Sequence, residues 1–443
     1  MAYSAYDNRK LGFTTRQLHA GYNPALNRGA KNVPIYQTAA FEFGNFEGMM
    51  RHQTKDEWGF SYSRCLNPTN RVLEERIASL DGGSAALSFS SGMGAISAVL
   101  LNLAEKGDEI ITVPTMYGES LSLIKDVLPS YGVQGRVAEN PDDISSFADL
   151  ITDRTKAIYI ESLGNPLINI IDFDALSALA HSHGIPLVVD NTFATPYLFR
   201  PLEHGADIVV YSATKYLGGH GTTVAGLAVE KGDFDWLNGR FPQFEAFYLQ
   251  QQGRYREQTL KTQLFTLRLY NRSLSLFGAH LAAQSAFNVI QGLETLSLRM
   301  ERHASNAQAV AEFLAAHPGV LEVSYPGLPD NPYHVLAEKY FPKGLTGMMS
   351  FRVRGGREAA KKVLDSVQIF DQMVNVGDSK SLIVYPAVAT HFTLSPEEQK
   401  KAGVYPDSIR ISVGIEDKED LLADLGQALD QAAAYIPENQ KNA

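Results

Sequence analysis

One lysine of the chain has neighbours that suit covalent chemistry better than solvation. Lys215 lies in the segment YSATKYLGGHG (211–221), where Ser212 and Thr214 precede it and three glycines follow. An amine can form an imine with an aldehyde, and hydroxyl groups and backbone N–H groups can bind a phosphate. The segment therefore suggests a lysine that holds an aromatic aldehyde phosphate.

Polar and aromatic residues follow other apolar segments in the same way. Asp190 ends the segment IPLVVD, Asn165 follows KAIYIES, and Tyr117 follows DEIITVP. Ligands of open α/β sheets bind at the carboxyl ends of the strands, so we expect these side chains to converge on one cleft. A buried carboxylate keeps a ring nitrogen protonated, and an aromatic ring can stack on the ligand. The segment SSGMGA (90–95) adds the N–H groups of a predicted helix start, which suit an anion.

Each of these features also has an ordinary explanation. An S-x-T-K string occurs often by chance, Asp190 could cap a turn, and SGMG could be a tight strand-to-helix connection. Their joint placement at successive strand ends favours a cofactor site. The remaining candidates are weaker: we interpret Cys65 as a packing residue, and His181 and His183, two positions apart on a predicted helix, do not face together. We therefore predict no metal site.

The bulk properties limit the class of protein. A chain of 443 residues is too long to fold around one ordinary hydrophobic core. Its 44% hydrophobic and 20% charged residues are typical of a globular protein. The net charge of −10 argues against nucleic acid as a partner. A single cysteine excludes an intrachain disulfide, and the sequence shows neither a secretory pattern at its start nor an apolar run long enough for a membrane helix. We expect a cytoplasmic protein with no membrane partner.

Apolar and amphipathic segments alternate through the middle of the chain. Residues 108–114, 156–162, 185–191 and 206–212 are predicted strands, and 120–128 and 172–184 are predicted helices. This alternation predicts an α/β fold with a mostly parallel sheet that is covered on both faces. We divide the chain into an N-terminal arm (1–60), a large cofactor-binding α/β domain (61–260), a helical connection (261–316) and a smaller C-terminal α+β domain (317–443).

Ordered motifs along nearly the whole chain resemble the pyridoxal-phosphate enzymes of cysteine and methionine metabolism. These motifs are LHAGYNP, VPIYQTAAFEF, YSRCLNPTN, SSGMGA, ESLGNP, VVDNTFATP, YSATKYLGGHG and IRISVGIED. The resemblance implies an aspartate-aminotransferase-like transferase fold (fold type I) and the cofactor pyridoxal 5′-phosphate. Lys215 would be the Schiff-base lysine and general base, Asp190 the partner of the pyridine nitrogen, and Asn165 the partner of the ring hydroxyl.

The resemblance implies roles for further residues. Tyr117 would stack on the cofactor ring and act in catalysis, and Arg410 would bind the substrate α-carboxylate, with Asn375 and Ser381 nearby. The neighbouring subunit would contribute Tyr62 and Arg64 to the phosphate, so the active unit would be at least a dimer and the assembly a tetramer. The phosphate-binding residues of the same chain would be Ser91, Gly92, Met93, Ser212 and Thr214.

Within the family, several segments most resemble the O-acetylhomoserine sulfhydrylases. This implies that sulfide or a thiol replaces acetate on O-acetyl-L-homoserine to give L-homocysteine. Cystathionine γ-synthase, O-succinylhomoserine sulfhydrylase and methionine γ-lyase activities stay open as alternatives. Methionine γ-lyases usually carry a cysteine shortly after the stacking tyrosine, where this chain has Glu119. Two departures, Tyr385 in place of a histidine and the segment 241–258, concern positions expected to border the substrate entrance.

Two other classes are disfavoured. A nicotinamide-dependent dehydrogenase needs a glycine pattern that Gly219 and Gly221, followed by Val224, do not complete. A non-catalytic binding protein would have no reason to keep Lys215, Asp190 and Arg410, since buried charges without partners are costly.

Overall fold

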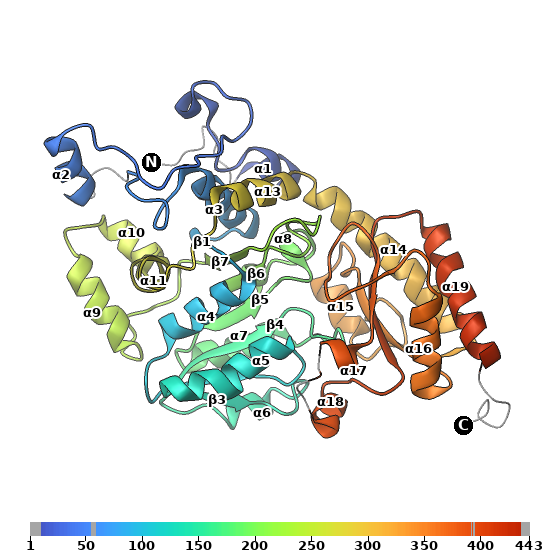
Figure 1. The fold of residues 1–443 in the computed structure, drawn as a ribbon. Helices are drawn as coiled ribbons and strands as arrows, with labels where there is room; N and C mark the ends of the chain where they lie inside the picture. The colour runs from blue at the N-terminus through green and yellow to red at the C-terminus, as the bar shows by residue number, and fades with distance from the viewer. Residues whose placement is uncertain (1–9, 55–58, 391, 393–394, 436–443) are drawn as a thin grey trace.

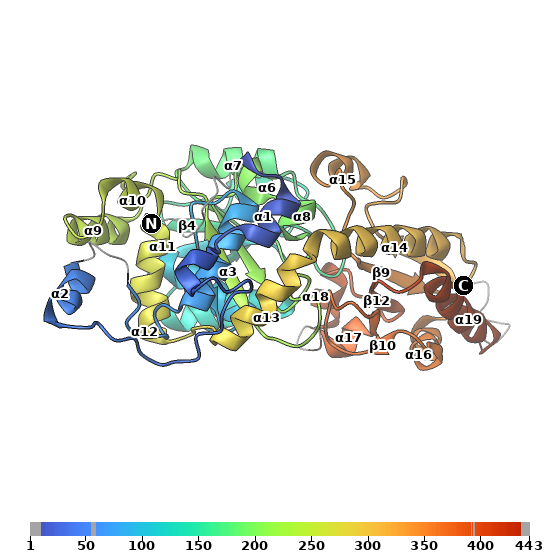
Figure 2. The ribbon, with the colours of Figure 1, turned by 90° about the horizontal axis from the view of Figure 1, so that it is seen from above.

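The computed structural model describes residues 10–54, 59–390, 392 and 395–435, and it contains two sheets (Figure 1). The larger sheet and the smaller C-terminal sheet lie side by side, and helix α14 (Leu296–Ala316) extends from one to the other (Figure 2). No helix in these ranges is both long and apolar enough to cross a membrane.

The larger sheet has seven strands in the order β1-β7-β6-β5-β4-β2-β3. Strand β7 runs antiparallel to its neighbours β1 and β6, and the other pairs are parallel, which confirms the predicted mostly parallel sheet. The four predicted strands are β2, β4, β5 and β6. The sequence pattern missed β1, β3 and β7. The strands are Ala85–Phe89 (β1), Glu109–Thr112 (β2), Gln134–Val137 (β3), Thr155–Glu161 (β4), Leu187–Asp190 (β5), Ile208–Ser212 (β6) and Gly226–Glu230 (β7).

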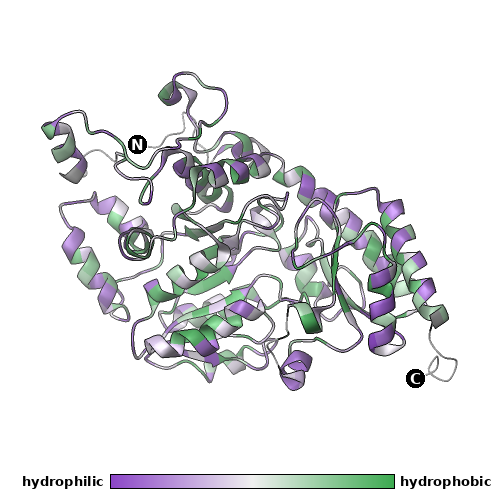
Figure 3. Cartoon of the chain, in the orientation of Figure 1, coloured by the Kyte–Doolittle hydropathy of each residue, from purple (hydrophilic) through white to green (hydrophobic). Residues whose placement is uncertain are grey.

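Apolar residues pack on both faces of this sheet. Successive residues of β5 illustrate this, because Val188 and Val189 are fully buried in two different hydrophobic clusters. Val189 shares its cluster with residues of α3, α7 and α14, and Val188 shares the other with residues of α4, α9 and α11. The central strands and α4 are accordingly among the most hydrophobic parts of the chain (Figure 3). Side chains alternate between faces along a strand, so near-continuous apolar strands need cover on both sides.

Polar side chains cap three of the helices that pack on this sheet, α3, α4 and α7. Ser91 accepts a hydrogen bond from the backbone N–H of Gly94 at 2.9 Å and starts α4, as the SSGMGA motif predicted. Asn67 caps α3, which ends at Gly82 in the left-handed conformation that favours glycine. The helices are α3 (Pro68–Asp81), α4 (Gly92–Leu103), α5 (Gly118–Ser122, continued by a π-helical turn Leu123–Val127), α6 (Ser145–Ala148), α7 (Phe173–Ser182) and α8 (Thr195–Leu198).

The N-terminal arm carries two helices that the sequence pattern missed, α1 (Phe13–His19) and α2 (Phe46–Thr54). Helix α1 docks on its own chain, where the buried Gln17 side chain exchanges two hydrogen bonds with Ser297. Helix α2 lies away from the rest of the chain in both views and exposes Phe46 and Met50 (Figures 1 and 2). The arm is therefore anchored near its start by α1, while its second helix leaves Phe46 and Met50 exposed.

The remaining elements are the helices that follow β7 and the strands of a second sheet. Five strands, in the order β10-β11-β12-β9-β8, form the second sheet. The end of α14 coincides with the predicted boundary at residue 316, and the proposed domain boundaries stay a prediction. The helices are α9 (Pro242–Gln251), α10 (Glu257–Thr262), α11 (Leu264–Leu269), α12 (Ser275–Phe277), α13 (Ala283–Glu294), α15 (His334–Tyr340), α16 (Gly356–Ser366), α17 (Pro386–Ala389), α18 (Pro396–Lys401) and α19 (Lys418–Tyr435). The strands are β8 (Val320–Ser324), β9 (Met348–Val353), β10 (Asp371–Gln372), β11 (Leu382–Val384) and β12 (Ser408–Ser412).

Three buried polar residues of α14 form hydrogen bonds with backbone carbonyl groups in both parts of the chain. Arg299, His303 and Asn306 are spaced so that they lie on one face of the helix. The Arg299 guanidinium donates to the carbonyl groups of Tyr216 at 2.7 Å and Gly292 at 2.6 Å. His303 Nδ1 lies 2.7 Å from the carbonyl oxygen of Val413, and the Asn306 amide donates to the carbonyl of Gly414 at 3.1 Å. The helix thus contacts the turn after Lys215 and the segment after β12.

This packing explains one of the glycines after Lys215. Gly219 has a φ of 69°, and a Cβ atom there would lie 2.0 Å from the Arg299 guanidinium. Both the backbone conformation and the close approach therefore require glycine at this position.

We predict that Arg299→Ala destabilises the protein by about 3 kcal/mol, because it leaves buried carbonyl groups without donors. Urea unfolding measures the change. Arg302→Ala is the matched control, since Arg302 is exposed on the same helix, and it should cost less than about 0.5 kcal/mol. Equal losses in the two variants would show that the Arg299 hydrogen bonds contribute nothing to stability.

Candidate active site

The Lys215 side chain lies in the turn after β6 and is mostly buried. Its ammonium Nζ donates to Oδ1 of Asn375 at 2.8 Å, which brings together two of the predicted site residues. Burial and the nearby charge of Arg410 lower the pKa of Lys215 to about 8. A much larger share of this amine is therefore neutral and nucleophilic near pH 7 than of an ordinary lysine.

Asp190, the last residue of β5, is buried without a cationic partner among the described residues. Its carboxylate accepts hydrogen bonds from the backbone N–H of Thr192 at 3.0 Å and from the Tyr159 hydroxyl at 3.3 Å. Burial raises the pKa of Asp190. A protonated ring nitrogen would supply the missing positive charge, so this residue fits the predicted cofactor.

Arg410 projects from β12, the central strand of the second sheet, and is 4% exposed. Its guanidinium donates to Oδ1 of Asn165 at 3.3 Å, and within the described ranges no carboxylate pairs with it. Burial lowers the pKa of Arg410 to about 10, so the group keeps its charge at neutral pH. A buried guanidinium without a counter-charge is suited to the carboxylate of a ligand.

The predicted phosphate-binding segments lie against each other at the start of α4. A Cβ atom on Gly92 would lie 2.7 Å from the Cβ atom of Ser212, so only glycine allows this approach. Met93 is in the first turn of α4, whose N-terminal N–H groups suit an anion. The Thr214 hydroxyl accepts a hydrogen bond from the backbone N–H of Ala225 at 3.0 Å, which fixes its turn.

Tyr117 lies immediately before α5, and its predicted role in stacking on the cofactor ring stays a prediction. Burial, followed by the charge of Glu119, raises the pKa of Tyr117 to about 12, so its hydroxyl stays protonated at neutral pH. Its backbone N–H donates to Oε1 of Glu161 at 2.7 Å.

Glu161 is a site residue that the sequence reasoning missed. It ends β4, and it is the register partner of Asp190 on β5. Burial and the charge of Asp190 raise the pKa of Glu161 well above its ordinary value. Its position at the end of an apolar strand, like that of Asp190, was the signal that could have identified it.

Three predicted residues are not joined to this group in a single chain. Tyr62 is 46% exposed, and the Arg64 guanidinium lies 5.4 Å from the Tyr62 ring centre and donates to the carbonyl of Ser275. The Ser381 hydroxyl is fully buried, where it donates to Glu416 at 3.0 Å and accepts from the N–H of Gly414 at 2.8 Å. That hydroxyl already has two partners, so its predicted role near the substrate carboxylate stays a prediction.

The two departures from the family pattern occupy different places. The Tyr385 hydroxyl donates to the carbonyl of Pro406 at 2.7 Å, directly before α17. In the segment 241–258, Phe244 stacks on Trp236 with ring centres 4.7 Å apart in the core beneath α9. Helices α9 and α17 lie far apart in both views, so the two segments do not border one site of the same chain (Figures 1 and 2).

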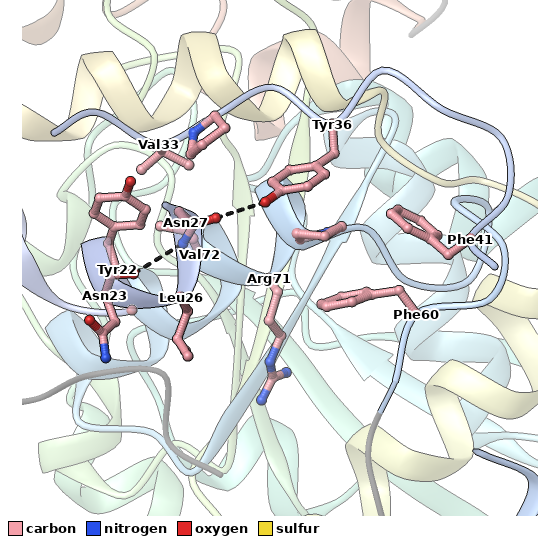
Figure 4. Close-up of a pocket in the computed structure, with 13 residues that line it drawn as sticks. Tyr22, Asn23, Leu26, Asn27, Val33, Tyr36, Phe41, Phe60, Arg71 and Val72 are labelled. Carbon is pink, nitrogen blue, oxygen red and sulfur yellow. Dashed lines mark hydrogen bonds between the residues drawn. The ribbon is translucent and has the colours of Figure 1, made fainter. Parts of the chain in front are cut away.

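Other polar side chains serve the fold. His181 pairs with Asp207 at 2.9 Å, and the Cys65 sulfur lies 3.4 Å from the Ser275 hydroxyl. Over the described part of the chain, no three histidine, cysteine, aspartate or glutamate side chains gather as metal ligands would. A pocket under the arm is lined by aromatic residues that include Phe41 and Phe60, and it contains none of the predicted site residues (Figure 4).

Comparison with known proteins settles the family. The sequence profile of the Cys/Met metabolism PLP-dependent enzymes matches residues 14–430. The chain belongs to this family. It is a pyridoxal-phosphate-dependent enzyme, and the Lys215, Asp190 and Arg410 geometry fits that cofactor and an amino-acid substrate.

Several relatives of this family member are similar over almost their whole length. The chain is 43% identical to the homocysteine synthase of Schizosaccharomyces pombe, over 95% of this chain and 98% of the relative. It is 40% identical to the O-acetyl-L-homoserine sulfhydrylase of Leptospira meyeri, over 94% and 96%.

A crystal structure shows the same fold. The putative O-acetylhomoserine (thiol)-lyase of Campylobacter jejuni, which carries a pyridoxyl-lysine monophosphate, is 39% identical with a TM-score of 0.89 over 95% of this chain and all of that one. The structure of metB from Corynebacterium glutamicum is 35% identical with a TM-score of 0.81, over 96% of this chain and 99% of that one. These matches confirm the predicted fold, cofactor and enzyme class.

We predict that cofactor-free enzyme captures pyridoxal phosphate faster as the pH rises, with a midpoint near pH 8, because capture needs the neutral Lys215 amine. Arg410→Gln should move this midpoint to higher pH, since it removes a positive charge that lowers the Lys215 pKa. Stopped-flow absorbance of the bound cofactor measures both. Arg302→Gln is the exposed control and should leave the midpoint in place. A midpoint above pH 10 in the unmodified enzyme would contradict the assignment.

Proposed function

We propose that the enzyme is an O-acetylhomoserine sulfhydrylase, which replaces the acetate of O-acetyl-L-homoserine by sulfide to give L-homocysteine. The proposal is carried by the full-length similarity to proteins named for this activity, with 94% to 95% of the chain covered at 40% to 43% identity. The proposal is also supported by the presence in one chain of Lys215 and Asp190, the predicted cofactor residues, and of Arg410, the predicted carboxylate-binding residue.

Each of the predicted site residues would have its own role in the reaction. Pyridoxal phosphate, when bound, withdraws electrons from the substrate and so allows a proton and the γ-substituent to leave. Arg410 would bind the α-carboxylate and so place Cα near the amine of Lys215. That amine would move the Cα proton, because a general base works best with a pKa near the working pH. Asp190 would keep the ring nitrogen protonated, and Tyr117 would cover the ring face.

Other reactions of the family differ in leaving group and nucleophile. Cystathionine γ-synthase, O-succinylhomoserine sulfhydrylase and methionine γ-lyase activities remain the alternatives. The chain is also 39% identical to the homocysteine/cysteine synthase of Saccharomyces cerevisiae, over 95% of this chain and 98% of the relative. A direct comparison of substrates separates these reactions.

The proposed assembly is a homotetramer built from dimers that share active sites. Tyr62 and Arg64 would complete the phosphate site of the neighbouring subunit, which is supported by the exposure of Tyr62 and by the family resemblance. A guanidinium fork matches phosphate geometry. Cytoplasmic location likewise stays a prediction.

We expect O-acetyl-L-homoserine with sulfide to give homocysteine at a higher kcat/KM than O-succinyl-L-homoserine with sulfide, or either ester with cysteine. Steady-state assays of homocysteine, cystathionine and 2-oxobutanoate measure this. Lys215→Ala should abolish turnover, because it removes the proposed base and the cofactor attachment. Faster cystathionine formation, or 2-oxobutanoate from methionine, would replace the proposal by one of its alternatives.

We expect inactive variants to complement each other across subunits. Mixing Lys215→Ala with Arg64→Ala chains and allowing the subunits to exchange should restore about a quarter of the activity, because half of the dimers are then mixed and each has one intact site. Activity at limiting pyridoxal phosphate is the measurement.

A mixture of Lys215→Ala with Asp190→Ala is the matched control for this exchange. Both groups belong to the same chain's site, so every site of a mixed dimer is damaged and no activity should return. Recovery in the control, or none in the test mixture, would show that Arg64 does not act across subunits.

A further inference from the structure

Glu119 is a carboxylate beside the active site for which the family resemblance gives no role. It lies in the first turn of α5, two positions after Tyr117, and its side chain is exposed. Within the described ranges, no lysine or arginine forms an ion pair with it. An exposed, unpaired carboxylate keeps its charge available to a ligand.

The turn that carries Glu119 is held in place from both sides. The backbone N–H of Tyr117 donates to Glu161 at 2.7 Å. On the other side, a Cβ atom on the buried Gly118 would lie 3.1 Å from the carbonyl oxygen of Thr390, which follows α17 of the C-terminal unit. The backbone before Glu119 therefore lies against both parts of the chain.

The charge of Glu119 reaches the groups that handle the substrate. It raises the pKa of Tyr117, also by accepting a hydrogen bond from the side chain, and it acts on Lys215 against the opposite effect of Arg410. The site therefore combines two buried cations with an exposed anion.

We propose that Glu119 selects against substrates that bring a second carboxylate, so that the enzyme takes a neutral acyl ester and a nucleophile without a carboxylate. This inference rests on the proposed function and deepens it. It applies to two alternatives at once, because an O-succinyl ester carries a carboxylate on its leaving group and cysteine carries one on the nucleophile.

The available cations do not offset this repulsion. The α-carboxylate of any homoserine ester would occupy Arg410, and Lys215 is bonded to Asn375 and serves the cofactor. Arg64 of the neighbouring subunit would bind the cofactor phosphate, so a second carboxylate would meet Glu119 without a counter-charge of its own. Specificity often comes from such a repulsive group, which lowers the affinity for the wrong ligand more than it helps the right one.

The test compares kcat/KM for the O-acetyl and O-succinyl esters, each with sulfide, in the unmodified holoenzyme and in Glu119→Gln. The substitution keeps size and hydrogen bonding but removes the charge. The acetyl-to-succinyl ratio should fall about tenfold. Glu119→Asp should keep most of the ratio. Asp126→Asn is the matched control, an exposed carboxylate on the π-helical turn that follows α5, and it should leave the ratio unchanged.

Raised salt gives a second readout that needs no variant. It should reduce the discrimination in the unmodified enzyme and have little effect in Glu119→Gln, because screening acts only on a charge. An unchanged ratio in Glu119→Gln, or a salt response equal in both proteins, would overturn the inference. If the unmodified enzyme does not convert O-acetylhomoserine and sulfide at all, the proposed function fails instead, so the two failures are distinguishable.

Discussion

The structure depends on the burial of three ionisable groups that have no counter-ion among the residues that the structure describes. Lys215, Asp190 and Arg410 come from the turn after β6, the end of β5 and the middle of β12, and each is removed from water. A fold that only needed stability would replace such groups, because desolvated charges are costly. Their cost is offset when a cofactor and a zwitterionic substrate bring the opposite charges, so the ligand completes the electrostatics of the protein.

The same constraint explains why a fair part of the site could be predicted from the sequence. Lys215, Asp190 and Asn165 follow apolar strands, and the topology of a parallel sheet brings such positions to one edge. Glu161 was missed although it has the same position on β4, because an acidic residue after a strand is common and only the register reveals that it lies beside Asp190. Family resemblance, and not the local pattern, identified Arg410.

The parts of the fold that were missed are those whose stability comes from tertiary contacts. Strand β3 has the sequence QGRV and lies half-exposed at the edge of the sheet, so it has no apolar run. Strand β7 begins with a glycine, and its pairing with β1 and β6 determines its conformation. Helix α1 has only seven residues, and contacts such as that between Gln17 and Ser297 hold it in place. The local sequence pattern does not predict such contacts.

Helix α14 has a mechanical consequence. The face that donates through Arg299 to the backbone beside the lysine is continuous with the face that binds, through His303 and Asn306, the residues directly after β12. The backbone segments that position the Lys215 amine and the Arg410 guanidinium are therefore both hydrogen-bonded to a single helix, α14. Thermal motion that tilts the C-terminal unit must therefore move both backbone segments together. The distance between the bound substrate's carboxylate and its reacting carbon atom is then preserved during this motion.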